Sequence, residues 1–404
     1  MSNLSEIILC FERSWEFDLG LVDFFKEAGY RLEILIVERG TNVNSARNKI
    51  LNSSCPVIFM TPNPIIALGE YEFMKSLAAT EVPIVYYNAD PPDLTWHFIP
   101  EDLKNLATLL GSAKSEKFWR EYVNQGPSTF TQYQTITPAV EKKLKQQKNK
   151  INNNKNIELF VPINYSWFGY TPEEFEVLFL TLPKFIQKII DTAVEKTLLN
   201  TEGTNTFEKE LKNSNFSLDC MQYKQVLRYF TYRLNLTKRK RLFQILKRYP
   251  VLISSNIKPS FFDEGDCKAR WIETNLENSV DLFFNANCIL TMPYIDDLIH
   301  DRVTTALACG AVPFIERQSI FDSRDILWSK IPSFTWNDSS LPEGLDDIFT
   351  NSKKYSLLGD ELKDIASKRV MSFSSEKLLS LLQLISDPYL SGSSLKSRRK
   401  IISQ

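Results

Sequence analysis

The sequence predicts an α/β protein of two Rossmann-like domains that face a central cleft, with a helical insertion in the second half. Three observations lead to this prediction. Short β-branched or aromatic runs alternate with segments of helical period over residues 1–115, the alternation returns after residue 250, and a polar, lysine-rich stretch separates the two halves. Near-continuous apolar strands spaced by helices are typical of a parallel sheet covered on both faces.

The N-terminal domain is expected over residues 1–140 of the 404. Between its first two predicted strands, residues 19–28 carry apolar side chains at three-residue steps, and Gly29 follows at the position of a C-terminal cap. We therefore expect a helix there. The predicted strands of this half are Ile7–Phe11, Leu32–Val37, Pro56–Met60, Ile84–Tyr87 and Leu106–Leu110.

The linker is expected at residues 141–156, where Lys, Gln and Asn leave no apolar surface to bury. The C-terminal domain then covers 157–385 and includes a helical insertion at about 171–249, and a polar basic tail covers 386–404. Its predicted strands are Ile157–Ile163, Val251–Ser254, Ala269–Glu273, Cys288–Met292, Ala311–Ile315 and Ser333–Trp336. The carboxyl ends of both sheets would face the cleft between the domains.

Composition excludes several classes of protein. Lys and Arg number 48 and Asp and Glu 49, for a formal net charge of −1, so no overall field attracts nucleic acid or an anionic membrane, and no nucleic-acid partner is expected. The six cysteines are scattered without a C-x-x-C pair, which indicates reduced core thiols of a cytoplasmic protein. No apolar run reaches the roughly 18 residues of a transmembrane helix, while peripheral contact with a membrane is left open.

Motif scans narrow the chemistry further. The sequence has no P-loop, no G-x-G-x-x-G, no G-x-S-x-G and no H-E-x-x-H. Its two histidines and unpaired cysteines make a zinc site improbable. No two aspartates stand two apart, so a D-x-D pair that would hold a metal-bridged diphosphate is missing. We therefore expect no metal and no cofactor.

The segment Tyr294–Glu316 carries the richest pattern. Apolar and small residues at helical spacing predict a helix that ends at Gly310 and leads into a buried strand. His300 and Arg302 would then lie in the first helical turn, where free N–H groups and the helix dipole favour an anion such as phosphate. In the alternative interpretation, Arg302 pairs with a neighbouring aspartate such as Asp301, and His300 is an exposed polar residue.

This segment, YIDDLIHDRVTTALACGAVPFIE, resembles the nucleotide-sugar motif of GT-B glycosyltransferases of the group 1 kind. The resemblance is closest to the spore-maturation-protein (CgeB-like) branch, whose pattern is H-E-R-V-F-E-A-L-A-C-G-A. The matching residues are His300, Arg302, Val303, Ala306, Leu307, Ala308, Cys309, Gly310 and Ala311. The glutamate that usually binds the donor ribose falls on Thr305, which can form hydrogen bonds but carries no charge.

A second stretch, Val85–Pro92, resembles the strand-end D-x-P segment of the same branch. Asp90 follows a buried strand, and the two prolines after it disfavour a helix, so a rigid loop would present its carboxylate to the cleft. In the alternative interpretation, Asp90 only caps or turns the chain. Asp93 and His97 are further candidates on the same loop.

The basic run at 237–241 opens a predicted helix and is interpreted as a solvated face or a membrane-surface patch. In the resembling family, the end of the strand that follows borders the donor pocket, which makes Asn256 and Lys258 candidate contacts. The resemblance implies further donor contacts from Tyr294, Thr304, Thr305 and Gly310.

The resemblance implies a glycosyltransferase that moves a sugar from a nucleotide diphosphate sugar to a glycan, lipid or protein acceptor, without a metal. His300 and Arg302 would stabilise the departing diphosphate, and Asp90 would act as the base. One alternative is a catalytically inactive GT-B scaffold that acts as a binding protein, with Thr305 marking a lost donor site. Another is a sugar-nucleotide epimerase of the same architecture, which would need a pair of carboxylates or histidines near the anomeric carbon.

Overall fold

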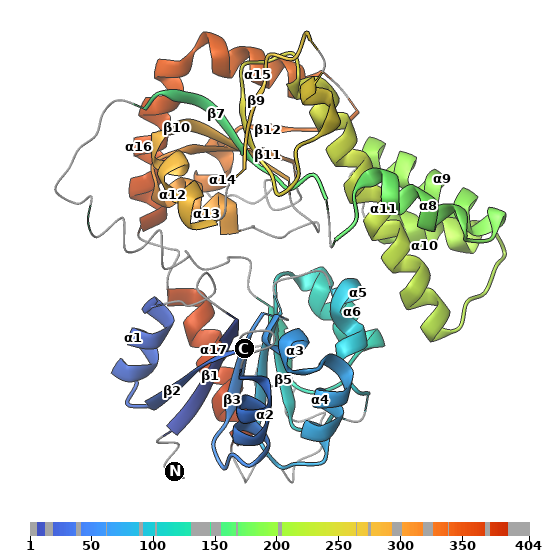
Figure 1. Ribbon diagram of the computed structural model, residues 1–404, viewed down its shortest axis with the longest axis vertical. Helices are drawn as coiled ribbons and strands as arrows, with labels where there is room; N and C mark the ends of the chain where they lie inside the picture. The colour runs from blue at the N-terminus through green and yellow to red at the C-terminus, as the bar shows by residue number, and fades with distance from the viewer. Residues whose placement is uncertain are drawn as a thin grey trace. The chain divides into compact units, whose positions relative to one another are not determined.

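A computed structural model gives the fold of two compact units, drawn in Figure 1. The first unit comprises residues up to 141 together with those from 369 onward, and the second comprises residues 142–368. The structure describes residues 6–12, 19–37, 42–61, 63–88, 92–101, 103–130, 146, 155–166, 169–200, 204–263, 265–273, 276–292, 301–317, 326–337, 339–367 and 372–386. Nearly all of the expected linker and tail, 141–156 and 386–404, lies outside the described residues.

The first unit is a six-stranded sheet in the order β2-β1-β3-β4-β5-β6, with every pair of neighbours parallel. Its elements are β1 (Glu6–Glu12), α1 (Leu19–Glu27), β2 (Arg31–Val37), α2 (Val43–Leu51), β3 (Val57–Met60), α3 (Asn63–Leu68), α4 (Glu70–Ala78), β4 (Ile84–Asn88), α5 (Pro92–Thr95), the 3-10 helix η1 (Trp96–Phe98), β5 (Leu106–Leu110), α6 (Ala113–Tyr122), β6 (Ser128–Phe130) and α17 (Ser372–Ser386).

Helices cover both faces of this sheet. On one face, side chains of α2, α3, α4 and α6, among them Phe73 and Trp119, pack on alternate strand residues. On the other face, Val22 and Phe25 of α1 pack beside Leu381 of α17. This alternation explains why the strands read as continuous apolar runs in the sequence.

Helix α17 belongs to the first unit although it ends the described chain. Figure 1 shows it, in red, beside α1 and the first strands. Its buried leucines, Leu378, Leu381 and Leu382, complete the core on one face of the sheet. The C-terminal domain expected over 157–385 therefore ends earlier in the structure, because the apolar face of α17 is buried against strands from the start of the chain.

The second unit is also a six-stranded parallel sheet, in the order β12-β11-β10-β7-β8-β9. Its elements are β7 (Ile157–Pro162), α8 (Pro172–Leu180), α9 (Lys184–Asn200), α10 (Thr204–Asn213), α11 (Cys220–Leu246), β8 (Leu252–Ser254), η2 (Ser260–Asp263), β9 (Arg270–Ile272), α12 (Leu276–Asn285), β10 (Ala286–Thr291), α13 (Asp301–Ala308), β11 (Val312–Glu316), α14 (Ile326–Lys330), β12 (Ser333–Phe334), α15 (Ser340–Thr350) and α16 (Ser352–Ser367).

The predicted fold class is confirmed: both halves are parallel sheets with flanking helices, and the expected strands form within a few residues of the predicted bounds. Strand β6 is not among the expected strands, because Ser128–Phe130 is short and half-buried and shows no apolar run. Helices α8 to α11 form the expected insertion between β7 and β8.

Two capping boxes fix helices of the insertion. Thr171 caps α8, with reciprocal hydrogen bonds between Thr171 and Glu174, and Asp219 and Gln222 do the same for α11. Arg233 of α11 then binds Glu176 of α8 and, at 3.0 Å, Asp191 of α9. The insertion is therefore a packed helical bundle held partly by ion pairs.

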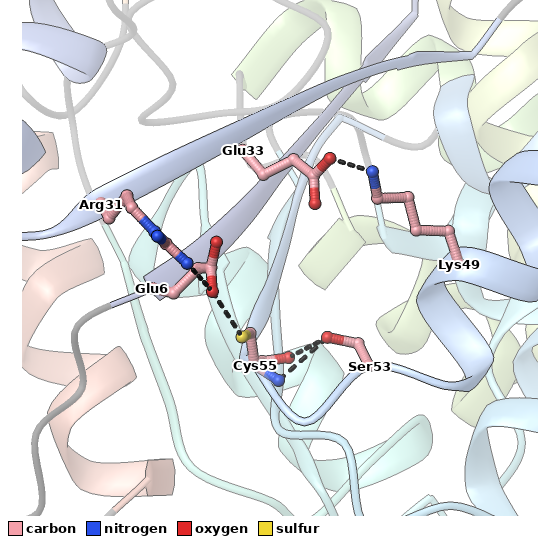
Figure 2. A network of polar contacts seen from close by, with 6 residues as sticks. All are labelled: Glu6, Arg31, Glu33, Lys49, Ser53 and Cys55. Atoms are coloured by element: carbon pink, nitrogen blue, oxygen red, sulfur yellow. Dashed lines mark hydrogen bonds and ion pairs between the residues drawn. The ribbon is translucent and has the colours of Figure 1, made fainter.

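A network of polar contacts lies at the amino ends of the strands of the first unit (Figure 2). Arg31, the first residue of β2, donates to Glu6, the first residue of β1, at 2.7 Å. The Cys55 thiol lies 3.7 Å from the same Glu6 carboxylate. The hydrogen bond from Arg31 is the main cause that lowers the pKa of Glu6. This network faces the edge opposite the carboxyl ends, so we assign it a structural role.

All six cysteines are free thiols, as expected. Cys10, Cys288 and Cys309 are buried, whereas Cys220, at the start of α11, is exposed and is not part of the core. In the part of the chain that the structure describes, no helix is both long enough and apolar enough to cross a bilayer.

The junction of α15 and α16 depends on one carboxylate. Asp347 of α15 accepts hydrogen bonds from Tyr355 at 2.6 Å, Lys354 at 2.9 Å and Asn351 at 2.6 Å. These three hydrogen bonds, that of Tyr355 first, lower the pKa of Asp347 to about 2. Folding therefore stabilises the ionised Asp347 carboxylate more than the protonated carboxylic acid.

We predict that Asp347→Asn lowers the melting temperature near neutral pH. Because the folded pKa lies below the unfolded value of about 3.9, the carboxylate stabilises the fold above that unfolded value, and this contribution is lost as the pH falls toward about 2. The difference between wild type and variant should shrink over the same interval in melting curves. The exposed Asp266→Asn serves as control, and an equal pH dependence in both variants would contradict the role of Asp347.

Candidate functional site

The strand order of the second unit indicates where a ligand would bind. With β7 counted as the first strand of this unit, the observed order is the Rossmann order 3-2-1-4-5-6 read from β9 to β12. The order reverses between β7 and β10, and open α/β sheets bind ligands at the carboxyl ends on either side of such a point. The register places Pro162, Ser254 and Thr291 at this edge, and Glu316 ends the next strand, β11.

Helix α11 brings two cations to this edge. The Lys238 ammonium lies 2.7 Å from one carboxylate oxygen of Glu316 and 3.0 Å from the other. Lys238 is 8% exposed and Glu316 4%, so the pair is buried. Arg239, 2% exposed, donates from Nη1 to the backbone carbonyl of Ser166 at 2.9 Å.

The interpretation of the basic run at 237–241 as a solvated face is therefore wrong for Lys238 and Arg239. Lys240 and Arg241 are exposed, as that interpretation required. Lys238 stands four residues from both Leu234 and Leu242, which are buried, so it lies on the inward face of α11. This spacing was the signal in the sequence that could have identified it.

Ser166 links the ends of two strands. Its backbone carbonyl accepts from Arg239, and its hydroxyl accepts from Asn256 Nδ2 at 2.6 Å. Asn256 comes two residues after β8, so the predicted contact residue does lie at the carboxyl edge. Next to it, the Ser255 hydroxyl accepts a hydrogen bond from Trp271 Nε1 at 2.8 Å. These bonds hold the loops after β7 and β8 against α11.

The loop after β7 is further fixed by Tyr165, whose hydroxyl donates to Glu173 of α8 at 2.7 Å. Burial first, and this hydrogen bond second, raise the pKa of Tyr165, so its phenol stays protonated at neutral pH. Lys258 is exposed on the loop after β8. Of the predicted donor contacts, Asn256 and Lys258 thus follow the same strand, and Asn256 directly joins the cluster formed by Arg239.

Between β7 and β11 lies β10, which ends at Thr291. Thr291 is 2% exposed, and its hydroxyl has no hydrogen-bond partner among the described residues. Such an orphan is uncommon, because burying a hydroxyl without a partner costs free energy. Tyr294 and His300, predicted on the segment that follows, lie outside the described residues.

Helix α13 begins at Asp301, so Arg302 does lie in its first turn, as predicted, and it is half-buried. Thr304 and Thr305 are buried, at 1% and 5% exposure. Thr305, which aligns with the ribose-binding glutamate of the resembling family, therefore lies in α13, and its surroundings exclude most solvent.

Gly310 lies at the other end of α13, about 12 Å from the first turn at 1.5 Å per residue. It has φ +73°, and its carbonyl oxygen accepts a hydrogen bond from Lys155. A Cβ atom on Gly359 of α16 would stand 2.1 Å from that oxygen. Gly310 is thus placed to turn the chain and to let α16 approach, and it does not join the residues at the carboxyl edge.

The corresponding edge of the first unit holds Asn88, the last residue of β4. Asn88 is fully buried, and its Nδ2 donates to Thr95 Oγ1 at 2.8 Å, while Oδ1 has no partner among the described residues. Asp90 lies outside the described residues. Asp93 is buried in α5, and the expectation of no helix here is wrong, because Pro92 occupies the first position of α5, where a missing N–H costs nothing.

His97, the other candidate on this loop, lies in η1 with its ring centroid 4.0 Å from that of Phe98.

Over the described ranges, no three His, Cys, Asp or Glu side chains come together as metal ligands would. The chemically distinctive groups of the second unit are therefore cations and hydrogen-bond donors gathered at strand ends. Such groups suit an anion with several oxygens, such as a diphosphate.

No protein-family model matches the chain, and no curated protein matches it. Among solved structures, sucrose-phosphate synthase from Thermosynechococcus elongatus is 9% identical over 94% of this chain and 99% of that chain, with a TM-score of 0.50. A glycosyltransferase from Rickettsia africae is 8% identical over 96% and 100%, with a TM-score of 0.47. HepE from Anabaena in complex with UDP-glucose is 11% identical over 93% and 99%, with a TM-score of 0.43.

At these identities, the comparison concerns the fold alone. The two six-stranded parallel sheets with flanking helices match the two-domain Rossmann-like GT-B fold that sucrose-phosphate synthase also has. The fold expected from the residues around α13 is thus present in the chain.

We predict that breaking the buried pair is costly and that replacing both partners is not. Glu316→Leu or Lys238→Met alone leaves a buried charge without its partner and should lower the free energy of unfolding by about 3–5 kcal/mol. The double variant should lose much less than the sum. Urea unfolding of the four proteins measures the coupling, and additive losses would mean that the pair does not hold α11 to β11.

Proposed function

We propose that the protein transfers a sugar from a nucleotide diphosphate sugar to an acceptor, and that the donor binds at the carboxyl edge of the sheet in the second unit. The observation that carries the proposal is the position of Arg239, which is 2% exposed and donates to the carbonyl of Ser166 after β7, one of the two strands between which the Rossmann order reverses. The charge of Lys238 is already matched by Glu316, so Lys238 positions α11, and Arg239 is the cation that we assign to the anionic donor.

Arg239 is the strongest candidate for contact with the diphosphate. Its planar guanidinium can donate two parallel hydrogen bonds to phosphate oxygens. Arg302 and His300 at the start of α13 would add a second cationic side and the positive end of the helix. Asn256, Lys258, Tyr294 and the Thr304–Thr305 pair would contact the remainder of the donor.

In this proposal, the diphosphate leaves with its charge stabilised by these cations and by helix N–H groups, without a bound metal. Asp90 of the first unit would accept the proton of the acceptor hydroxyl. The resemblance to the CgeB-like branch supports this assignment of His300, Arg302 and Asp90. Glycans, lipids and proteins all offer hydroxyl groups as acceptors.

One observation favours a second function, a binding protein of the same fold without activity. Thr305 stands where the resembling family has a glutamate for the ribose hydroxyls, and it is buried with no charge to offer. A scaffold of this kind would bind nucleotide weakly or not at all. Activity with a donor therefore separates the two functions.

We predict donor-dependent release of nucleoside diphosphate when the protein is incubated with a panel of UDP-, GDP- and ADP-sugars in EDTA. Asp90→Asn should reduce transfer to an acceptor by about 10²–10⁴-fold, because a general base contributes that much, while donor binding persists. Product detection by mass spectrometry measures both. Absence of release and of any melting shift with every donor would favour the inactive scaffold.

We predict that Arg239→Gln weakens binding of the best nucleoside diphosphate by about 10-fold or more, since a charge-assisted hydrogen bond contributes about 1.5–3 kcal/mol. Binding of the matching nucleoside should change little. Arg239→Lys should retain part of the affinity, and Arg241→Gln, exposed two residues along, is the matched control. Calorimetry with both ligands tests this, and equal losses for nucleoside and diphosphate would assign Arg239 to the fold alone.

A further inference from the structure

The far end of the helical insertion exposes apolar side chains. Helix α8 begins after the loop that follows β7, and α9 ends where Asn337, after β12, donates to the Leu199 carbonyl at 2.8 Å, so the turn between α8 and α9 lies at the distal end of the bundle. The ring of Phe185, the second residue of α9, and the ring of Phe216, in the α10–α11 turn, have their centroids 4.7 Å apart, so this turn lies at the same end. Figure 1 shows the bundle of α8 to α11 projecting from the sheet of the second unit.

We define the apolar tip as Leu180, Phe185, Phe216 and Met221. Leu180 is 53% exposed and Phe185 47%, and Phe216 and Met221 are exposed to a similar degree. Four large apolar side chains at one end of a bundle form an unusual surface for a protein in water, because such patches commonly mark contact with a partner or a membrane.

The charge around the tip is positive. Lys184 and Lys188, one turn apart on α9, and Lys212 near the end of α10 are all exposed, and none forms an ion pair with a described residue. Asp219 is the acidic residue of the α10–α11 turn, and its carboxylate caps α11 through Gln222 N at 2.8 Å. The tip is thus basic, although the whole chain has a formal net charge of −1.

We propose that the apolar tip docks onto the surface of an anionic lipid bilayer. Phenylalanine, leucine and methionine side chains would enter the headgroup boundary while the flanking lysines meet lipid phosphates and acidic headgroups. The positive charge selects an anionic surface over a neutral one, and the tip's place at the free end of the bundle lets it reach a surface before the sheet does. Binding of this kind needs no membrane-spanning helix.

The test is co-sedimentation of the full chain with vesicles of phosphatidylcholine containing phosphatidylglycerol, compared with phosphatidylcholine alone. We expect binding to the anionic vesicles that weakens as salt is added. The variant Phe185→Ser with Phe216→Ser should lower the partition coefficient by at least about tenfold. Leu357→Ser, at a side chain that is 64% exposed on α16, is the matched control and should bind as wild type.

Variants of the flanking lysines test the proposal independently of the apolar side chains. Replacing Lys184, Lys188 and Lys212 by Gln should weaken anionic binding by about fivefold for each lysine near the surface. The matched triple replaces the exposed lysines Lys75, Lys104 and Lys353 and should have little effect. Because bulk charge falls equally in both, a similar loss in the two triples would overturn the proposal.

A folding defect in the double phenylalanine variant is controlled by Leu180→Gln, which leaves the contact between the two rings in place. Melting curves and circular dichroism establish that each variant folds. No binding of folded wild type to anionic vesicles at low salt overturns the proposal. So does self-association that the double variant abolishes without vesicle binding, since the tip would then be an interface between copies of the chain.

Discussion

The buried contact of Lys238 with Glu316 is the interaction on which the architecture of the second unit most depends. It joins α11, the last helix of the insertion, to the carboxyl end of β11, at 2.7 Å and with both side chains nearly inaccessible. Because a buried charge tolerates few positions, this pair fixes the rotation of α11 about its axis. That rotation determines that Arg239 points to Ser166 and that Lys240 and Arg241 point to water.

The same helix gives the insertion two ends with different chemistry. At the sheet, α11 carries cations into the edge where the strand order reverses, and the loops after β7 and β8 bind to it through Ser166 and Asn256. Its 27 residues extend about 40 Å, and at the other end the bundle exposes Phe185 of α9 and Phe216 of the α10–α11 turn. One rigid element would therefore connect the proposed donor site with the proposed membrane contact.

Much of the fold was predictable from the sequence, because buried parallel strands are apolar on both faces and read as short continuous runs. β6 was missed since Ser128–Phe130 has no such run. The placement of α17 was missed because its leucines do not reveal which sheet they cover. Pairing between distant segments is a property of tertiary packing, on which local periodicity carries no information.

The candidate site was predictable only in part. Asn256 lies at the carboxyl edge, as the resemblance implied, and Arg302 lies in the first turn of α13, as the helical spacing indicated. Gly310 belongs to the same sequence motif, yet a helix separates its two ends by about 12 Å over eight residues, so the motif does not map onto one site. Lys238 and Arg239 were misjudged, because a run of basic residues conceals which of them share a face with Leu234 and Leu242.

Hydrogen exchange with and without a saturating nucleoside diphosphate tests the central claim most directly, since it reports where the ligand binds without depending on any variant. If the donor binds at the carboxyl edge, exchange should slow in residues 163–166 after β7, in residues 252–258, which are β8 and the loop after it, and in the first turn of α13. Exchange at the amino ends of the same strands should not change. Protection confined to those amino ends, or to the first unit, would contradict a donor site at the carboxyl edge of the second sheet.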